Sequence, residues 1–205
     1  MPCSRALFKR RGGPYHSTVP TVSDVLGLLG VFEPGEDARA GRSVALVRDL
    51  LARSPAPFFR SSYELGHLTA SGVVLSPDRS SVLLVYHRRL ARWLQPGGHI
   101  ERDDATIEAA ARREVLEETG VTPLDGTGAV VVGVDVHEIP AARGEPPHWH
   151  HDIALAFGAT MQPLRPTEEI RDAVWCPVTE LDRYGVDTAL RLSVARAVVR
   201  RASAP

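Results

Sequence analysis

The segment from Asp104 to Thr119 has the spacing of a helix that packs against a core, but its inward stripe changes character halfway along. Ile107 and Ala111 make the first part of the stripe apolar. At the same helical spacing the stripe continues with Glu114 and Glu118. The fold of this chain must therefore accommodate carboxylates on the buried side of a helix.

Carboxylates that face a core are costly unless they are paired, hydrogen-bonded or bound to a metal. Glu117 flanks the two inward glutamates, and three such groups within two helical turns repel one another. A divalent cation relieves that repulsion, and carboxylate oxygens suit Mg²⁺ or Mn²⁺. The alternative is a solvated face in which Arg113 and Glu117 form an i, i+4 pair in the weaker order. Because that alternative leaves Glu114 and Glu118 unexplained, we favour a metal site.

The loop before this helix carries the pair Gly97-Gly98 directly after a proline. Two glycines let a backbone bend sharply and approach a ligand closely. A glycine pair is often only a turn, but in front of a carboxylate helix it indicates the wall of a phosphate site. We expect Asp103 or Asp104 to cap the helix and Gly120 to end it.

The N-terminal part of the chain is predicted to be a leader followed by helices. Residues 1–20 are rich in Gly, Pro, Ser and Arg, which is typical of a flexible leader. Amphipathic spacing predicts helices over 21–30 and 42–53, which carry too few apolar residues to close a core alone. We therefore assign residues 21–60 to a helical N-terminal extension.

From residue 65 onward, strands alternate with helices. This order predicts an α/β (α+β) domain over 61–205, with a mixed sheet between helical layers and the terminal helix included. The expected elements are a hairpin of strands at 68–75 and 81–87, further strands at 92–94, 129–139, 149–161 and 170–176, loops at 95–98 and 141–147, a helical turn at 179–184 and a helix at 188–201.

Charge and cysteine content argue against several classes of function. The net charge of -1 gives no field that recruits polymeric nucleic acid or an anionic membrane, and no run is apolar enough to span a bilayer. Cys3 and Cys176 are far apart and form no CxxC pair, so we expect neither a disulfide nor a structural zinc site. A cytoplasmic location fits this composition, with Cys176 as a packed hydrophobe.

A second polar cluster, with the sequence His-Trp-His-His-Asp, begins at His148. On a strand, His148, His150 and Asp152 point to one face. These side chains can hydrogen-bond a substrate phosphate or base, or bind a transition metal, and His99 and His137 are candidates to join them. The ordinary alternative is a set of strand-end polar residues bonded to loops. We rank substrate contact above a dedicated metal site.

Residues 98–121 resemble the Nudix box, which is a glycine, five residues, a glutamate, seven residues, then Arg-Glu-aliphatic-any-Glu-Glu-any-Gly-aliphatic. The second half matches completely from Arg113 to Val121. In the first half, which begins at Gly98, Asp104 replaces the glutamate and eight residues instead of seven precede Arg113. The resemblance implies a Nudix-type α/β/α sandwich around a mixed sheet, to which the N-terminal helices are added.

The resemblance also implies roles for individual residues. Glu114, Glu117 and Glu118 correspond to metal ligands, and Glu114 to the group that orients or deprotonates the attacking water. Arg113 corresponds to the arginine that holds the glutamates in place. The carbonyl of Gly97 corresponds to a backbone metal ligand.

Substrate contacts are expected at Gly98, at His99 and at the ring of Trp93, which can stack on a base. The histidine cluster described above supplies the other expected contacts. Nudix enzymes often recruit a further carboxylate from outside the box. The candidates for it here are Glu138, Glu145 and the pair Glu168-Glu169.

Taken with the resemblance, the sequence predicts a Mg²⁺-dependent hydrolase, with Mn²⁺ as a substitute, that cleaves a diphosphate linkage in a nucleoside diphosphate linked to another moiety. The expected partner is a small nucleotide or diphosphate, and since Nudix enzymes are often dimers, a homodimer is open. One alternative is an isopentenyl-diphosphate-type isomerase, but the early strands lack the cysteine that such chemistry uses. The other is a nucleotide-binding module without turnover, which has no need of three crowded glutamates.

Overall fold

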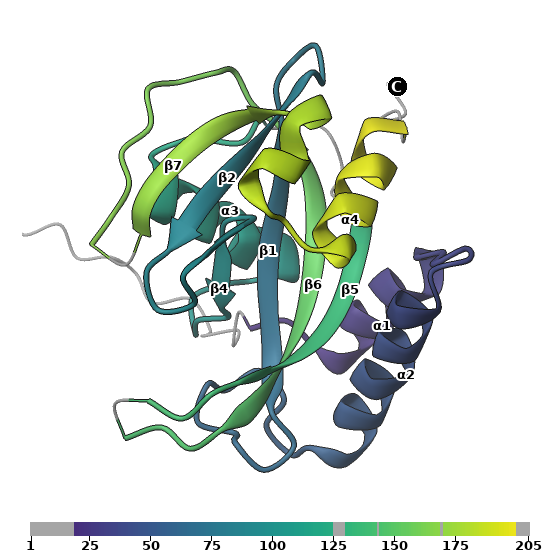
Figure 1. Cartoon of the computed structure of the whole chain (residues 1–205). Helices are drawn as coiled ribbons and strands as arrows, with labels where there is room; N and C mark the ends of the chain where they lie inside the picture. Colours follow the sequence, from purple (N-terminus) through teal and green to yellow (C-terminus); the bar gives the residue numbers. More distant parts are fainter. Residues whose placement is uncertain (1–18, 125–129, 143, 169, 200–205) are drawn as a thin grey trace, which may run out of the picture.

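The computed structural model describes residues 19–124, 130–142, 144–168 and 170–199, which form a mixed sheet with helices on both faces (Figure 1). Residues 1–18 of the expected leader lie outside this described part. The elements in chain order are α1 (Val22–Val31), α2 (Ala38–Arg53), β1 (His67–Leu75), β2 (Ser81–His87), β3 (Arg92–Leu94), β4 (Gly97–His99), α3 (Ile107–Thr119), β5 (Val130–Ile139), β6 (His148–Gly158), β7 (Ile170–Pro177), the 3-10 helix η1 (Val178–Tyr184) and α4 (Thr188–Val199).

The sheet has the strand order β3-β2-β1-β6-β5, with β4 added to β1 and β7 added to β2. β1 pairs with β6 in parallel, and the other pairs are antiparallel. The hairpin expected between β1 and β2 is short, because their recorded register is the pair Leu75↔Val82. Away from that pair, β1 takes β4 as its neighbour, while β2 pairs with β3 and β7. The sheet thus divides into one part with β1, β4, β5 and β6 and another part with β2, β3 and β7.

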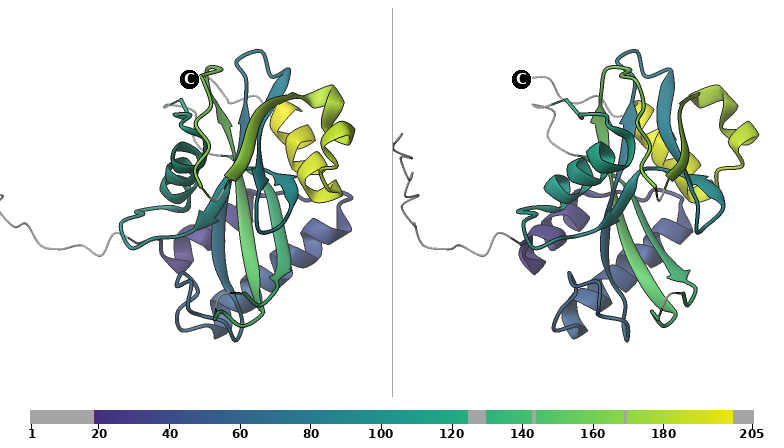
Figure 2. Two further views of the ribbon diagram at one scale, coloured as in Figure 1. Left: turned by 60° about the vertical axis from the view of Figure 1, so that its left-hand side comes forward. Right: turned by 90° about the vertical axis from the view of Figure 1, so that its left-hand side faces the viewer.

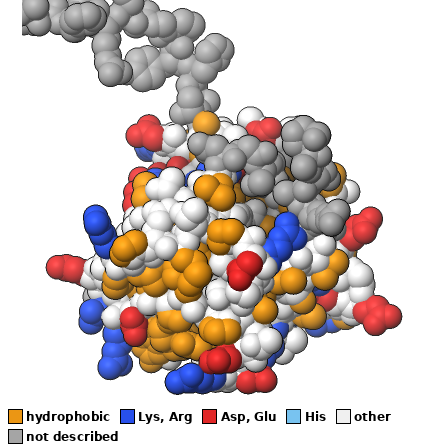
Figure 3. All heavy atoms as spheres, turned by 90° about the horizontal axis from the view of Figure 1, so that it is seen from above, with side chains coloured by type: hydrophobic (Ala, Val, Ile, Leu, Met, Phe, Trp, Pro, Cys, Tyr) orange, Lys and Arg blue, Asp and Glu red, His pale blue; other side chains and the backbone are white. Residues whose placement is uncertain are grey.

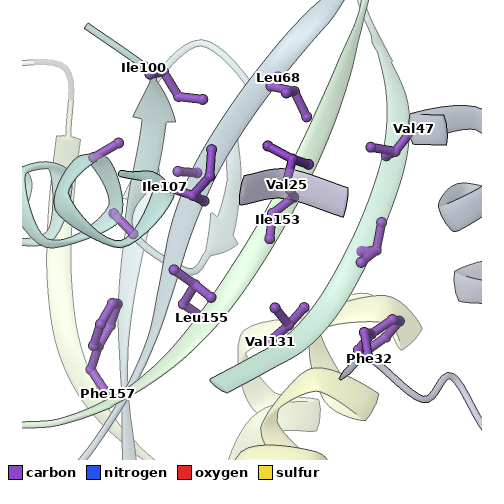
Figure 4. Packing of buried hydrophobic residues seen from close by; sticks show 14 of the residues in the cluster. Val25, Phe32, Val47, Leu68, Ile100, Ile107, Val131, Ile153, Leu155 and Phe157 are labelled. Atoms are coloured by element: carbon purple, nitrogen blue, oxygen red, sulfur yellow. The ribbon is translucent and has the colours of Figure 1, made fainter. Parts of the chain in front are cut away.

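The two faces of the sheet contribute to separate hydrophobic clusters, because successive side chains of a strand point to opposite sides. In β1, Leu68, Ala70 and Val74 belong to the cluster that also contains side chains of α1, α2 and α3 (Figure 4). Val73 and Leu75 belong to the cluster that contains side chains of α4. Figure 2 shows the sheet between α3 and α4. The predicted α/β/α sandwich around a mixed sheet is confirmed.

Helix α2 covers the outer edge of the sheet, which is formed by β5. The backbone N–H of Val136 in β5 donates to Ser43 Oγ at 3.2 Å, where a further strand would otherwise pair. Arg39 in the first turn of α2 donates to Asp135 at 2.8 Å. An edge strand covered in this way is less open to pairing with another molecule.

Two sequence-based expectations about the elements were wrong. The loop expected at 95–98 runs into a short strand, because the backbone of β4 pairs with residues 69–71 of β1. Helix α2 begins at Ala38 instead of residue 42, because the Asp37 carboxylate caps it by accepting the N–H of Ala40 at 3.0 Å. The other described elements begin and end within three residues of the expected bounds.

Apolar side chains also remain on the surface, among them Val31 and Val199. Seen from above, groups of hydrophobic side chains lie between scattered arginines and acidic residues (Figure 3). A mixed surface of this kind is ordinary for a globular domain. Among the described residues, no helix is both long and apolar enough to cross a bilayer.

Candidate active site

Helix α3 carries the carboxylate stripe on the side that packs against the sheet. Ile107 and Ala111 are fully buried at its start. Glu118 is 9% exposed and the side chain of Glu114 is 14% exposed, whereas that of Glu117 is 56% exposed. The structure therefore places two glutamates on the buried stripe and the third beside it, as the periodicity predicted.

Thr106, and not Asp103 or Asp104, caps the start of this helix. Its Oγ1 accepts the backbone N–H of Ala109 at 3.0 Å. Gly120 ends the helix as expected, with a φ of 73° in the left-handed region that favours glycine. The expected cap was wrong because the aspartates precede the first helical turn and one of them has another partner.

That aspartate, Asp104, is buried and forms an ion pair with Arg113. The guanidinium donates to it from Nη2 at 2.8 Å and from Nε at 3.1 Å. The same carboxylate accepts the backbone N–H of Glu101 at 2.8 Å. Asp104 therefore ties the loop before α3 to the middle of the helix.

Arg113 also orients the glutamates. Its Nη1 donates to Glu114 and to Glu117, both at 2.9 Å, and its Nη2 donates to the carbonyl of His99 at 2.8 Å. Burial lowers the pKa of Arg113, but its hydrogen bond with Asp104 and the charge of Glu114 outweigh this effect and raise that pKa above its usual value. Arg113 is thus a fixed positive charge that holds two of the three glutamates.

The Gly97-Gly98 pair forms a wall against α3. The N–H of Gly97 donates to Glu118 Oε2 at 3.0 Å. A Cβ atom at Gly98 would lie 2.7 Å from a carboxylate oxygen of Glu114, and one at Gly97 would lie 2.4 Å from Ser71 Cβ. Both positions need glycine for this close approach. The recorded contact of Gly97 uses its N–H, so metal binding by its carbonyl stays a prediction.

The acidic cluster attracts a divalent cation by its charge, but among the described residues its oxygens do not converge at the spacing of a metal site, since Arg113 lies between Glu114 and Glu117. Asp104, Glu114, Glu117 and Glu118 bring four carboxylates to the region held by Arg113 and the glycine wall. Burial raises the pKa of Glu114, and the positive charge of Arg113 only partly offsets this. A cation among these oxygens relieves the penalty on the charged form, and hard oxygen donors suit Mg²⁺.

Five histidines gather on the face of the sheet that carries Val73, away from α3. His67 of β1, His150 of β6 and His137 of β5 are register neighbours and so point to the same side. The ring centroid of His150 lies 4.8–5.8 Å from those of the other four, which are His67, His99, His137 and His148. The structure thus brings together every histidine that the sequence pointed to, and adds His67.

Asp152 shares this face but has different partners. Its carboxylate accepts the hydroxyl hydrogens of Thr69 at 2.9 Å and Ser71 at 2.6 Å, and a hydrogen from Gln95 Nε2 at 3.3 Å. Burial raises the pKa of Asp152 above its usual value. Asp152 therefore ties β6 to β1 and to the loop before β4, and because it also lines the pocket described below, its contact with substrate stays a prediction.

The inner histidines are neutral at neutral pH. Burial lowers the pKa of His67 and of His99 to about 4, and neighbouring imidazoles add to the effect. The pKa of His150 is lowered to about 2 for the same two reasons, with burial again the larger. Each of these rings therefore offers one N–H donor and one nitrogen lone pair.

Both clusters line one pocket of about 1460 Å³. Glu114 and Glu118 belong to its wall, as do the rings of His99 and His150. His99 joins the two clusters, because its carbonyl accepts from Arg113 while its ring contacts the other histidines. The pocket exceeds the size usual for a drug-sized ligand. Other lining residues include the arginines Arg88, Arg92 and Arg102.

Comparison with known proteins decides the family. The family model described as NUDIX domain matches residues 66–197. The chain belongs to the NUDIX family. Phosphatase NudJ of Escherichia coli (strain K12) and of Shigella flexneri are each 41% identical to it over 56 residues, 27% of this chain and 36% of the relative. The match thus spans little more than a third of the length of these curated relatives.

Among solved structures, the NUDIX domain of Shewanella oneidensis NrtR, complexed with ADP ribose, is similar to this chain. The TM-score is 0.52 at 20% sequence identity, over 73% of this chain and 95% of that domain. This similarity shows the shared fold. Within the Nudix box, Asp104 stands at the position of the first glutamate, and its ion pair with Arg113 shows what the shorter side chain contacts here.

Some predicted Nudix site residues lie elsewhere. The ring of Trp93 packs edge-on against Tyr86 and Tyr184 at 5.4 and 5.1 Å and is not among the residues that line the pocket. Cys176 is fully buried in the second hydrophobic cluster, so none of the described residues that line the pocket is the cysteine that the isomerase alternative requires. Cys3 lies outside the described residues.

The candidates for an additional carboxylate differ in where they lie relative to the pocket. Glu145 lines the pocket but pairs with Arg60 at 3.1 Å. Glu168 lines the pocket, and Glu138 is exposed on β5. Glu169 lies outside the described residues. Glu168 is therefore the candidate that best fits the predicted role.

His67 is the site residue that sequence reasoning missed. The signal was present in β1, where His67, Thr69 and Ser71 alternate with Leu68 and Ala70. This alternation places a polar face at the start of a strand that is buried on both sides. This alternation is easily missed in the sequence, because the residues of β1 taken together look like an apolar strand.

Proposed function

We propose that this chain is a Mg²⁺-dependent Nudix hydrolase that cleaves a diphosphate linkage in a nucleoside diphosphate linked to another moiety. The observation that carries the proposal is the placement of Glu114. Arg113 holds its carboxylate at 2.9 Å, and the backbone of Gly98 leaves room for it at the pocket wall. The family assignment and the intact second half of the box support the same reading.

In the proposed reaction, water attacks one phosphorus and the bond to the bridging oxygen breaks, which leaves two phosphorylated products. Glu114, Glu117 and Glu118 would hold Mg²⁺, which would supply charge screening at the phosphate oxygens and activation of the water. Glu114 takes the proton from that water. Its raised pKa suits this role, because a base whose pKa lies nearer to neutral is a better proton acceptor.

The substrate is proposed to enter along the glycine wall. Gly98 has no side chain, so a phosphate can approach the backbone closely. Arg88, Arg92 and Arg102 are among the residues that line the pocket, and arginine suits phosphate oxygens because it donates hydrogen bonds in pairs. A small nucleotide substrate and a cytoplasmic location are parts of the same proposal, and the buried free thiol of Cys176 fits a reducing compartment.

The proposal is tested by a phosphate-release screen in Mg²⁺ and in Mn²⁺ over nucleoside triphosphates, dinucleoside polyphosphates, nucleotide sugars and ADP-ribose. Three proteins are compared: wild type, Glu118→Gln and Glu108→Gln. Glu108 lies on the same helix and pairs with Arg112 at 2.8 Å, so Glu108→Gln is the matched control. Turnover in wild type and Glu108→Gln that collapses in Glu118→Gln is the expected result.

Two outcomes would overturn the proposal. Turnover that does not need a divalent cation, or that survives in Glu118→Gln, would place the chemistry elsewhere. No turnover across the panel, with thermal stabilisation by a nucleotide, would instead indicate a binding module.

A further inference from the structure

We propose that His67, His99 and His150 form a second metal site, which binds one divalent transition-metal ion such as Zn²⁺ and is separate from the carboxylates of α3. One ligand nitrogen from each of the three residues lies within 4.8 Å of the other two. They come from β1, β4 and β6, which the sheet fixes side by side. The site is therefore built on rigid strands and not on a flexible loop.

The spacing of these nitrogens is close to that of a metal site. Zinc bonds of 2.0–2.1 Å in tetrahedral geometry place neighbouring nitrogens about 3.4 Å apart. The observed spacing of up to 4.8 Å is wider than this, so the three rings have to turn toward one another when an ion binds.

The nitrogen of His67 that faces no partner is the strongest single indication. His67 is fully buried, and its Nδ1 lies 3.4 Å from the carbonyl of Ser62, which can only accept a hydrogen bond. The Nδ1 therefore carries the hydrogen and Nε2 carries the lone pair. That Nε2 is buried and has no hydrogen-bond partner in the described part of the chain. An unsatisfied buried polar atom is costly, and a metal ion would satisfy this one.

The neighbouring His148 has the same arrangement. Its Nδ1 donates to the carbonyl of Pro146 at 2.8 Å, which leaves Nε2 with a lone pair 3.3 Å from Nε2 of His150. Histidines that bind metals commonly donate their other N–H to a carbonyl or carboxylate in this way. His148 Nε2 thus accepts the Nε2–H of His150 and fixes His150 in the tautomer whose lone pair is on Nδ1.

The two charged side chains beside the histidines have opposite signs, so together they do not repel a bound cation. Arg60 acts electrostatically on His67 and His99, and Glu145 acts on His99, but these two charges pair with each other at 3.1 Å. The metal would be held by neutral imidazoles, which need not release a proton to bind it. Neutral nitrogen donors favour Zn²⁺, Co²⁺ or Ni²⁺, whereas the carboxylates of α3 favour Mg²⁺.

The two sets of ligands therefore select different ions within one pocket. Three protein ligands would leave one coordination position for another ligand, and His99 and His150 line the pocket, from which a substrate or water would reach the ion. An anionic oxygen is the ligand class that such a position takes.

The test is calorimetric titration of the metal-free chain with Zn²⁺ in excess Mg²⁺, so that the carboxylates are already occupied. Wild type and Glu118→Gln are expected to bind one Zn²⁺ per chain with similar affinity. His99→Asn and His150→Asn are expected to weaken binding at least about tenfold, since even the loss of a supporting group costs that much. His87→Asn is the matched control, because His87 lies on β2 outside the triad.

Two results would overturn this site: wild type that binds no stoichiometric Zn²⁺, or His150→Asn that binds as well as wild type. Circular dichroism checks that each variant folds. Visible absorption of Co²⁺-loaded wild type provides a readout without any substitution. Bands typical of nitrogen ligation are expected, and a spectrum of Co²⁺ with oxygen ligands alone would contradict the site.

Discussion

The guanidinium of Arg113 donates to the buried carboxylate of Asp104 from two nitrogens, at 2.8 and 3.1 Å. This pair connects the loop before α3 to the residue that holds Glu114 and Glu117. Asp104 therefore acts on the metal-binding region through Arg113 and not by direct contact.

Replacing Asp104 with asparagine is expected to lower both stability and activity. Arg113 would keep its charge in a half-buried place and lose its main partner, and breaking such a pair costs about 3 kcal/mol. The free energy of unfolding from urea denaturation measures the first effect. Asp103→Asn is the control, because Asp103 is the exposed neighbour in the same loop. Equal stability of the two variants would show that the pair has no structural role.

Gly98→Ala is expected to reduce turnover about 100-fold while leaving the fold intact. The new methyl group would push the Glu114 carboxylate from its place, and a misplacement of about an ångström costs a rate factor of that order. Because the carboxylate is the far end of a flexible side chain, the melting temperature should change little. Turnover and melting temperature are measured together.

Gly41→Ala serves as the control for that substitution. A Cβ atom at Gly41 meets nothing within 4 Å, and the residue lies inside α2. Helix propensity predicts a gain of about 0.5–1 kcal/mol with no change in turnover. If Gly98→Ala were as active as Gly41→Ala, the glycine wall would not position Glu114.

The Asp37–Arg196 ion pair predicts a pH-dependent link between α2 and α4. Burial raises the pKa of Asp37, but the N–H of Ala40 and the Arg196 guanidinium at 2.9 Å outweigh this and lower that pKa below 3.8. A lowered pKa means that the pair stabilises the fold above pH 3.8 and that this contribution is lost as the pH falls below it. Asp37→Asn is therefore expected to cost about 1–2 kcal/mol at neutral pH.

Urea denaturation of wild type and Asp37→Asn over a pH series measures this link. The difference between their unfolding free energies should shrink as the pH falls below 3.8. The exposed neighbour Glu36, changed to glutamine, provides the comparison. A difference that stayed constant with pH would assign the effect to the cap of α2 and not to the charge.

Much of the fold could be predicted from the sequence because it depends on the spacing of residues close together in the chain. The stripe of Ile107, Ala111, Glu114 and Glu118 repeats at helical spacing, so its burial could be predicted. Gly120 could be predicted to end the helix because glycine readily adopts the left-handed conformation found there.

The features that could not be predicted from the sequence depend on contacts between segments that are distant in the chain. The strand at Gly97–His99 exists because β1 lies beside it, and three residues carry no periodicity of their own. Asp104 looked like a helix cap because its partner Arg113 lies nine residues away, inside the helix itself. His67 joins His150 only through the parallel pairing of β1 with β6.

The most direct test of the account is the turnover of Glu114→Gln in Mg²⁺, on whichever substrate the screen identifies, beside wild type and Glu108→Gln. Glutamine keeps the size of the side chain but accepts no proton from water. We expect kcat to fall by a factor of about 10²–10⁴ in Glu114→Gln and to be unchanged in Glu108→Gln. If Glu114→Gln turned over within a few-fold of wild type, the proposed role of the α3 carboxylates would be wrong.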